Sequence, residues 1–347
     1  MKNHPYTEVD EFQRWGAQFK SFDYSKVNFQ TNPKFKIPFD AKIATAGSCF
    51  AQHISNYLQR VGVKTYRTEL PPGYLLETSD EYLTYTRYSA RYGNVYTVKQ
   101  LKNLIDQAFS IIPVIHDYQI DSGVYIDLLR PAFTTLEYES IDEISAQRNF
   151  HLQKVREMFE NTDIFIFTLG LTEAWKNKEH GYVYPICPGT SVGTFDPNLH
   201  GFINFGYEEI KSDLEYCINL LMTKNPKIQI ILTVSPVPLA ATYQKKNVVV
   251  ANCHSKSTLR VVADSISEMF DNVDYFPSYD ILTSPAASGN YYDFTSRNIN
   301  TMGVDIAMQH FISSYMQLDL NNKINTSEYK KFEVNCDEEQ YGNLLRN

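Results

Sequence analysis

The sequence predicts an α/β protein, a three-layer α/β/α sandwich in which a mainly parallel sheet lies between two layers of helices. Short apolar runs of strand length recur along the chain, and segments with helical periodicity lie between them. Strands that are apolar on both faces are typical of parallel sheets covered by helices, and alternation of strands with helices favours the same architecture. The 347 residues suit one elaborated domain. We expect it at residues 39–316, with an N-terminal extension at 1–38 and a C-terminal tail at 317–347.

The individual elements follow from local signals. The first strand, residues 42–46, meets a tight turn at Gly47, and the helix after this turn ends at Gly62. Ser140 and Glu143 have the spacing of a capping box, which marks the start of a later helix. Further strands are expected at 63–67, 163–169, 228–234 and 273–276. Helices are expected at 50–60, 79–92, 97–109, 142–159, 208–223, 252–270 and 301–316, with a small β excursion within 113–138 and a Gly/Pro-rich loop at 176–206.

Composition excludes several classes of protein. The formal net charge is −8 and no run of basic residues occurs, so nucleic acid is not an expected partner. No stretch of about 18 apolar residues predicts a membrane span. The five cysteines are widely spaced, which predicts free thiols rather than a disulfide framework or a zinc site. The N-terminus does not resemble a signal peptide. We therefore expect a cytoplasmic protein without a metal or a resident cofactor, and the oligomeric state stays open.

The turn at Gly47–Ala51 is the strongest candidate for chemistry. It places Ser48 and Cys49 at the N-terminus of a helix, where backbone N–H groups favour negative charge. Such a position favours a thiolate, and the same N–H groups can hold an oxyanion. His53 follows Cys49 by four residues, so the two lie on one helix face. The alternative is a turn of small residues with a buried cysteine and a helix histidine.

This segment resembles the signature of the GSCFA family, which belongs to the SGNH-hydrolase-like superfamily. The pentapeptide Gly47–Ala51 reads Gly-Ser-Cys-Phe-Ala, and five further blocks resemble those of the family in the same order. These blocks are Gly93–Thr97, Thr168–Trp175, Thr233–Leu239, Ala251–Ser257 and Tyr275–Tyr279. The resemblance covers about residues 40–312. It implies an SGNH/flavodoxin-like sandwich and an enzyme that transfers or hydrolyses acyl groups.

The superfamily's roles can be assigned to some positions of this chain. Its first block, Gly-Asp-Ser, places Cys49 at the nucleophile, and a shift of one residue would place Ser48 there. We expect Cys49, with Ser48 as the alternative. The second block implies an oxyanion role for Gly93, with Asn94 beside it. The third block, Gly-x-Asn-Asp, corresponds to Gly170–Glu173 and places Thr172 at the oxyanion Asn. The full set of expected oxyanion or substrate-binding residues also includes Gly47 of the first turn, Glu173, Trp175 and, on the rim loop after residue 234, Ser235.

The fourth block of the superfamily supplies a histidine that this chain lacks. The corresponding segment, Asp293–Asn298, contains no histidine, so a general base must come from elsewhere. The candidates are His53, which is nearest to the turn in sequence, His254 and His180, although a lone histidine is more often a surface or packing residue. Lys256 and Arg260 share a helix face near His254 and could bind a phosphate or a carboxylate, or simply pair on the surface.

Two functions remain open from the sequence. The first is an ester hydrolase or O-acyltransferase, with acetyl as the expected group, that acts on a small-molecule or saccharide substrate. Aromatic residues make up 14 % of the chain and could line a groove for a sugar, or could simply fill the core. Acyl-coenzyme A is a conceivable co-substrate. The second function is a catalytically inactive binding or scaffold protein, which the missing histidine favours.

Overall fold

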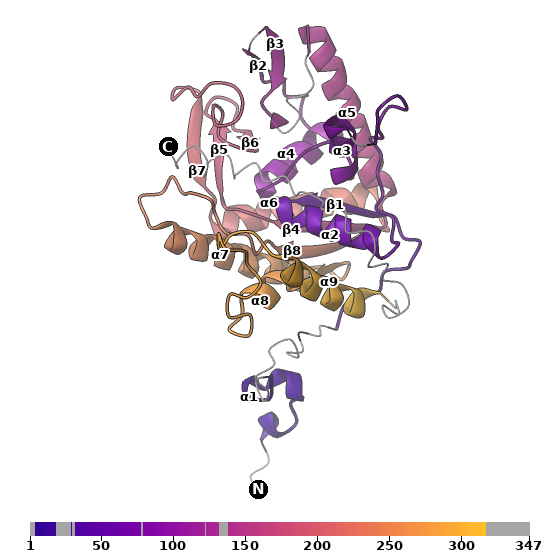
Figure 1. Ribbon diagram of the computed structural model, residues 1–347, viewed down its shortest axis with the longest axis vertical. Coiled ribbons are helices and arrows are strands. Elements are labelled where there is room, and N and C mark those ends of the chain that lie inside the picture. Colours follow the sequence, from indigo (N-terminus) through magenta and orange to yellow (C-terminus); the bar gives the residue numbers. More distant parts are fainter. Residues whose placement is uncertain are drawn as a thin grey trace.

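The centre of the molecule is a parallel sheet of four strands in the order β1-β4-β8-β9. The computed structural model describes residues 4–18, 29, 32–77, 79–121, 123–131 and 138–316 (Figure 1). The four strands are β1 (Ile43–Gly47), β4 (Ile164–Leu169), β8 (Gln229–Val234) and β9 (Val273–Tyr275). Gly47 lies opposite Thr168, and Thr168 lies opposite Thr233. The carboxyl ends of β1, β4 and β8 therefore share one edge of the sheet.

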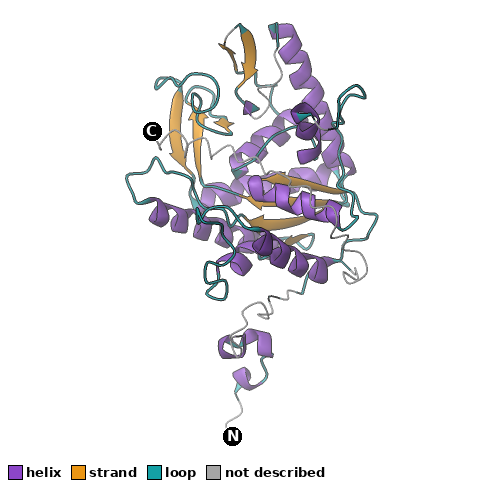
Figure 2. Ribbon diagram, in the orientation of Figure 1, coloured by secondary structure: helices purple, strands orange, loops and turns teal. Residues whose placement is uncertain are grey.

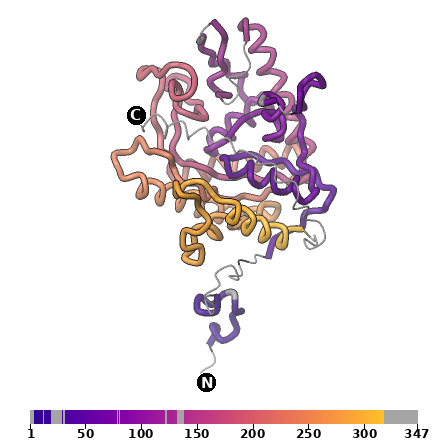
Figure 3. Tube along the Cα trace, viewed as in Figure 1, coloured from indigo at the N-terminus to yellow at the C-terminus, as the bar shows by residue number. Residues whose placement is uncertain are grey.

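Helices cover both faces of this sheet, which confirms the three-layer α/β/α sandwich (Figure 2). One face carries α4 (Val98–Ala108), α5 (Ile141–Asn161), α6 (Tyr207–Lys224) and α7 (Val248–Met269). The other face carries α2 (Cys49–Arg60), α8 (Ser278–Thr283) and α9 (Thr301–Tyr315). Helices α2 and α9 contact each other although some 250 residues separate them in sequence, as the indigo and yellow segments of Figure 3 show.

Alternation along the strands builds a separate core on each face. Ile164 and Ile166 pack toward α2 and α9, whereas Phe165 and Phe167 pack toward the four helices on the opposite face. Successive side chains of a strand point to opposite faces, so an unbroken apolar run supplies both cores. The apolar runs that predicted parallel strands thus have a direct structural cause.

The predicted strand at 63–67 is reduced to one bridge. Thr65 pairs with Ile43 of β1 in parallel fashion, and no named strand forms there. With this segment beside β1, the order matches the 2-1-3-4-5 sheet of flavodoxin-like folds. The strand order reverses between β1 and β4. In open α/β sheets, ligands bind outside the carboxyl ends of the strands at such a reversal.

The predicted loop at 176–206 was wrong, because much of it belongs to a small antiparallel sheet. Its strands are β5 (Glu173–Asn177), β6 (Val183–Tyr184) and β7 (His200–Asn204). Trp175 lies opposite Tyr184 on one side and Phe202 on the other. These strands are held by cross-strand aromatic pairs, a contact that glycine and proline counts do not reveal.

The remaining elements lie outside the main sheet. The β excursion is a hairpin of β2 (Tyr118–Asp121) and β3 (Val124–Asp127), and α3 spans Asp80–Arg87. Within residues 1–38, the described parts contain η1 (Pro5–Thr7), η2 (Glu11–Gln13) and α1 (Trp15–Gln18). The predicted tail at 317–347 lies outside the described residues.

Candidate functional site

The turn after β1 is fixed by backbone hydrogen bonds on two sides. The Gly47 carbonyl accepts from the Val95 N–H at 2.8 Å, and the Ser48 N–H donates to the Thr168 carbonyl at 3.2 Å. Gly47 has a φ of +136°, and a Cβ there would lie 2.4 Å from the Thr168 oxygen. Only glycine fits this position, so the sequence sets the sharp bend that delivers Ser48 to the start of α2.

Ser48 occupies the N-cap of α2 without capping it. Its backbone is extended, as N-caps usually are, but its hydroxyl accepts no hydrogen bond from the helix. The side chain is 3 % exposed, and the described residues offer its Oγ no hydrogen-bond partner. A buried hydroxyl without a partner costs about 1–3 kcal/mol, so the fold tolerates this group at a loss of stability.

Gly170, at the end of β4, allows close packing against Ser48. A Cβ on Gly170 would lie 3.0 Å from the Ser48 Cβ and 2.9 Å from the Tyr96 carbonyl oxygen. The N–H groups of Gly170 and Leu171 both donate to that carbonyl, at 3.1 and 2.9 Å. The structure therefore brings together the first, second and third sequence blocks, as the resemblance implies.

Cys49 has a different environment from Ser48. It is 4 % exposed and belongs to the apolar cluster that also contains Phe50, Ile54 and Val237. Apolar surroundings oppose the formation of a thiolate, which weakens the sequence argument for an activated Cys49. His53, one turn further on, is half-buried, and burial lowers its pKa to about 4. Its imidazole is therefore neutral at pH 7 and a weak base.

Asn94 and Thr172, which were expected to help form an oxyanion hole, already make hydrogen bonds to other residues of the protein. The Asn94 Oδ1 accepts from Gln52 at 3.0 Å. The Thr172 hydroxyl donates to Asn204 at 2.6 Å and lies 3.1 Å from the Ser255 hydroxyl. Both side chains are buried. In this conformation, Asn94 and Thr172 serve internal contacts, and the remaining candidate for oxyanion binding is the N-terminus of α2.

Ser235 and Gly93 position the loops at the same edge of the sheet. The Ser235 N–H donates to the Leu169 carbonyl at 2.8 Å, and its hydroxyl accepts from the Val237 N–H at 3.3 Å. Gly93 precedes Asn94 in the segment that binds Gly47. The polar contacts of Ser235 therefore shape the backbone of the loop after β8.

Sequence reasoning missed the position of Lys256. It is fully buried, and its Nζ donates to the Gly170 carbonyl at 2.7 Å. Its neighbour in the prediction, Arg260, instead pairs on the surface with Asp264 at 2.8 Å and Asp280 at 3.2 Å. Lys256 lies one turn before Leu259 on the face of α7 that packs on the core, which was the available signal.

The other two histidine candidates do not approach the turn through any contact the structure shows. His254 is exposed on α7, and its carbonyl accepts from Thr258. His180 lies in the turn between β5 and β6, and its ring stacks near Tyr182 at the surface. Lys256 is a basic side chain near the turn, because it donates to the carbonyl of Gly170, which packs closely beside Ser48.

Glu173 and Trp175 line a pocket of about 270 Å³, and Leu171 also belongs to its wall. Trp175 contacts Phe202 and Tyr243, with ring centroids 5.8 and 4.9 Å away. One oxygen of Glu173 accepts hydrogen bonds from the Thr242 hydroxyl and the Gln244 amide, both at 2.7 Å. Neither Ser48 nor Cys49 lines this pocket.

The described residues show neither a metal-binding cluster nor a membrane-spanning helix. Within residues 4–316, apart from the gaps given above, no group of three or more His, Cys, Asp or Glu side chains is arranged to hold a metal ion. The helices of the same segments include none with the length and apolar character that a bilayer span requires. The four described cysteines carry free thiols.

Comparison with known proteins places the chain in a family. No curated protein sequence matches it. One similar solved structure is an acetyl xylan esterase from the rumen bacterium Butyrivibrio proteoclasticus, with 13 % identity and a TM-score of 0.22. The similarity covers 70 % of this chain and 56 % of that protein, so the chain spans little more than half of its length. The model of the GSCFA family matches residues 42–311, and the chain belongs to the GSCFA family.

Proposed function

We propose that this protein is an acyl-ester hydrolase or O-acyltransferase whose nucleophile lies in the Gly47–Ala51 turn. The observation that carries the proposal is the buried, unpartnered hydroxyl of Ser48 at the point where the strand order reverses. A hydroxyl held there at a cost in stability is typical of a functional group. We therefore favour Ser48 over Cys49 as the nucleophile, and the competing choice of Cys49 remains a prediction that the variants below decide.

The proton of Ser48 needs an acceptor, and Lys256 is the group we assign. Gly170 lies beside both residues: a Cβ on Gly170 would be 3.0 Å from the Ser48 Cβ, and the Gly170 carbonyl accepts from the Lys256 Nζ at 2.7 Å. Removal from water disfavours the charged form of an amine, and a neutral amine can act as a general base. Attack by Ser48 on an ester carbonyl would yield an acyl-serine and release the alcohol, which leaves with the proton. The acyl group would then pass to water or to a second hydroxyl.

The pocket beside Leu171 supports a saccharide as the alcohol part of the ester. Its aromatic wall offers the apolar face of a sugar ring a surface to pack on, and Glu173 offers a hydrogen-bond acceptor for hydroxyl groups. The same pocket could hold the acyl group of a longer ester. Acyl-coenzyme A is the donor we propose for the transferase form of the reaction.

The direct test is turnover of simple acyl donors by the purified protein. Release of p-nitrophenol from p-nitrophenyl acetate reports hydrolysis, and release of free coenzyme A from acetyl-coenzyme A reports transfer. Lack of turnover of both donors, with and without added acetylated or free oligosaccharides, would contradict the enzyme proposal. The result would then favour the second candidate.

The second candidate is a binding protein that retains the fold without the chemistry. Ser48 and Cys49 are each less than 5 % exposed, and both lie outside the aromatic pocket. An enzyme must open this region before a substrate can reach Ser48, whereas a binding protein need not. Saccharide binding in the pocket with no acyl turnover would identify this function.

Replacement of Lys256 by methionine is expected to lower ester hydrolysis by roughly 100-fold or more, the usual effect of losing a general base. Methionine keeps the apolar stem and removes the amine. The pH profile of kcat distinguishes a base from a structural lysine, because loss of a general base alters the shape of the profile and loss of a structural side chain does not. Arg260→Met, on the same helix, is the control and should leave hydrolysis within about twofold of wild type. Equal activity in the two variants would remove Lys256 from the reaction.

Replacement of Trp175 by alanine is expected to raise KM for a saccharide ester by about tenfold and to change kcat little. Trp175 should contact the substrate to the same extent in the ground state and in the transition state. Its loss therefore weakens binding without slowing the chemical step. Phe294→Ala is a matched control, since this side chain is 98 % exposed. Steady-state kinetics on both variants provide the measurement. An unchanged KM in Trp175→Ala would show that the substrate lies elsewhere.

A further inference from the structure

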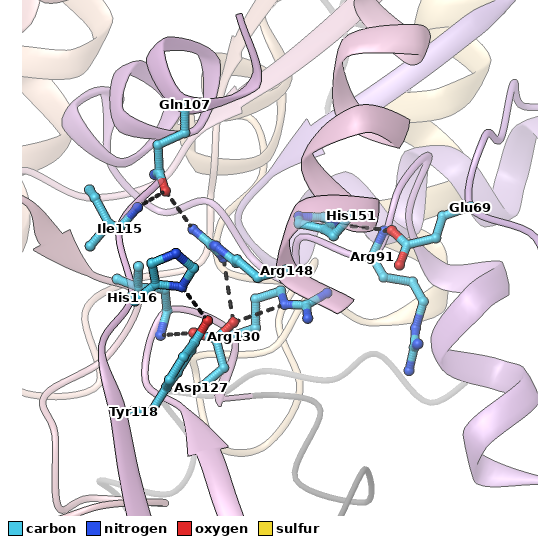
Figure 4. Close-up of polar contacts among 11 residues, drawn as sticks. Glu69, Arg91, Gln107, Ile115, His116, Tyr118, Asp127, Arg130, Arg148 and His151 are labelled. Carbon is cyan, nitrogen blue, oxygen red and sulfur yellow. Dashed lines mark hydrogen bonds and ion pairs between the residues drawn. The ribbon is translucent and has the colours of Figure 1, made fainter. Parts of the chain in front are cut away.

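A second polar cluster lies between α4, α5 and the β2–β3 hairpin, apart from Ser48 and Cys49 (Figure 4). It surrounds a cavity of about 30 Å³ that Arg130, Arg148 and His151 line together. All three side chains are buried. A water molecule needs roughly 10–15 Å³ by this measure, so the cavity has room for about two waters or one group of similar size.

The cluster holds more positive than negative charge. The Asp127 carboxylate receives both Arg130, at 3.2 Å, and Arg148, at 3.5 Å. Burial opposes ionisation of Asp127, but the two guanidinium groups hold its pKa below the usual value. Asp127 thus pairs with two arginines, as the dashed lines in Figure 4 show. The second carboxylate, Glu69, acts on Arg130 and on Arg91, so three guanidinium groups face two carboxylates. Buried charge without a counter-charge is costly, so an additional anion would stabilise this arrangement.

The second carboxylate of the cluster, Glu69, already has hydrogen-bond partners. Glu69 accepts from the Arg91 N–H and from the His151 Nδ1, both at 2.8 Å. Burial raises the pKa of Glu69, but the contacts with His151, Arg130 and Arg91 outweigh it and lower the pKa to about 2. Glu69 is therefore ionised at neutral pH and can only accept hydrogen bonds, which fixes the hydrogen of His151 on Nδ1.

Two nitrogen atoms at this cavity remain without partners. Arg148 donates through Nη2 to Gln107 at 3.1 Å, but its Nε has no hydrogen-bond partner among the described residues. The same holds for the Nε2 of His151. Both atoms are buried, and unsatisfied buried polar atoms are rare in native proteins. They indicate a ligand, because two side chains of α5 that line the same cavity each have a nitrogen without a hydrogen-bond partner.

We propose that this cavity binds a small carboxylate ion such as acetate or formate. A carboxylate matches the planar geometry of a guanidinium group, carries the single negative charge that the cluster lacks and fits the available volume. The Nε–H of Arg148 donates to one carboxylate oxygen. The site is distinct from the proposed reaction at Ser48 and does not depend on it.

Binding of the anion is coupled to a proton on His151. With its hydrogen on Nδ1, the neutral ring presents a lone pair at Nε2, which would repel a carboxylate. Protonation turns Nε2 into a donor. The charged groups that act on His151 are Glu69, which favours its charged form, and Arg130 and Arg148, which oppose it. A bound carboxylate adds a second negative charge, so acetate binding should take up one proton and strengthen as the pH falls.

Isothermal titration of the purified protein with sodium acetate at constant ionic strength tests the site. We expect saturable one-to-one binding that strengthens by up to about tenfold per pH unit between pH 7.5 and 5.5, as uptake of one proton requires. Sodium sulfate at the same ionic strength serves as the reference for general salt effects. Absence of saturable acetate binding to the wild-type protein at pH 5.5 overturns the proposal and assigns the cavity to water.

Variants on one helix separate the site from general effects of charge. Arg148→Gln should weaken acetate binding by at least tenfold, whereas Arg156→Gln should leave it unchanged. Arg156 is also on α5 but bonds to Ala108 and Ser110 instead. His151→Gln should retain weak acetate binding and lose its pH dependence, a readout that a purely structural histidine would not change. Equal affinities in the Arg148 and Arg156 variants, or unaltered pH dependence in His151→Gln, overturn the assignment.

Discussion

Ser48→Ala is expected to abolish ester hydrolysis and to make the protein more stable than the wild type. Loss of a nucleophile lowers kcat by several orders of magnitude, roughly 10³-fold or more. The substitution also deletes a buried hydroxyl that has no hydrogen-bond partner among the described residues. Removal of such a group should raise the free energy of unfolding by about 1 kcal/mol. Activity assays and urea unfolding of one protein preparation measure both effects.

Cys49→Ala and Cys49→Ser are the matched comparisons for Ser48→Ala. Cys49 packs in the apolar cluster beside α2, so truncation to alanine should lower stability slightly and leave most of the hydrolysis intact. If hydrolysis is lost in Cys49→Ala, partly recovers in Cys49→Ser and persists in Ser48→Ala, the nucleophile is Cys49. That pattern would restore the role that the family resemblance gives to Cys49.

The main sheet could be predicted because each strand is recognisable from its own short run of apolar residues. Residues such as Ile164 and Phe165 are apolar on both faces of one strand, and the structure places a helical layer over each face. Gly62 was expected to end the first helix, and it follows the C-cap residue Val61 with a φ of +84°. The parallel strands then implied that the loops after Ala46, Leu169 and Val234 share one edge of the sheet, and the register of β1, β4 and β8 places them there.

What the sequence could not provide were features that depend on contacts between distant segments. The pairing of Trp175 with Tyr184 and Phe202 creates a sheet inside a segment rich in glycine and proline. The burial of Lys256 depends on the Gly170 carbonyl, 86 residues earlier in the chain. A lysine is normally a surface residue, so the residue type favours the wrong environment even though its helical position beside Leu259 marks the core face.

The segment Gly93–Tyr96 connects the two sites proposed for this protein. Its Val95 bonds to Gly47 in the turn and also lines the cavity beside His151. Its Tyr96 carbonyl accepts from Gly170 and Leu171. A change in this segment would therefore reach both sites, and substitutions there cannot separate acyl transfer from anion binding. Substitutions of Ser48, Arg148, His151, Lys256 and Trp175 lie outside this segment and can separate the two activities.

Gly47→Ala should give the largest loss of stability of any substitution considered. The new Cβ would lie 2.4 Å from the Thr168 oxygen and 2.7 Å from the Thr168 nitrogen, both backbone atoms of a central strand. The φ of +136° adds backbone strain to this overlap. Strain and overpacking each cost about 1–3 kcal/mol, so we expect a total of roughly 3–5 kcal/mol. Urea unfolding measures this change in the free energy of unfolding.

Gly62→Ala separates the two causes of that loss. Gly62 also has a positive φ, +84°, but a Cβ there would meet no atom within 4 Å. Its substitution should cost about 1 kcal/mol, from backbone strain alone. The difference between the two variants therefore measures the steric contact of β1 with β4 at Thr168. Similar losses in both would show that β1 can move away from β4, and a turn that moves so readily could not hold Ser48 in a fixed position for attack.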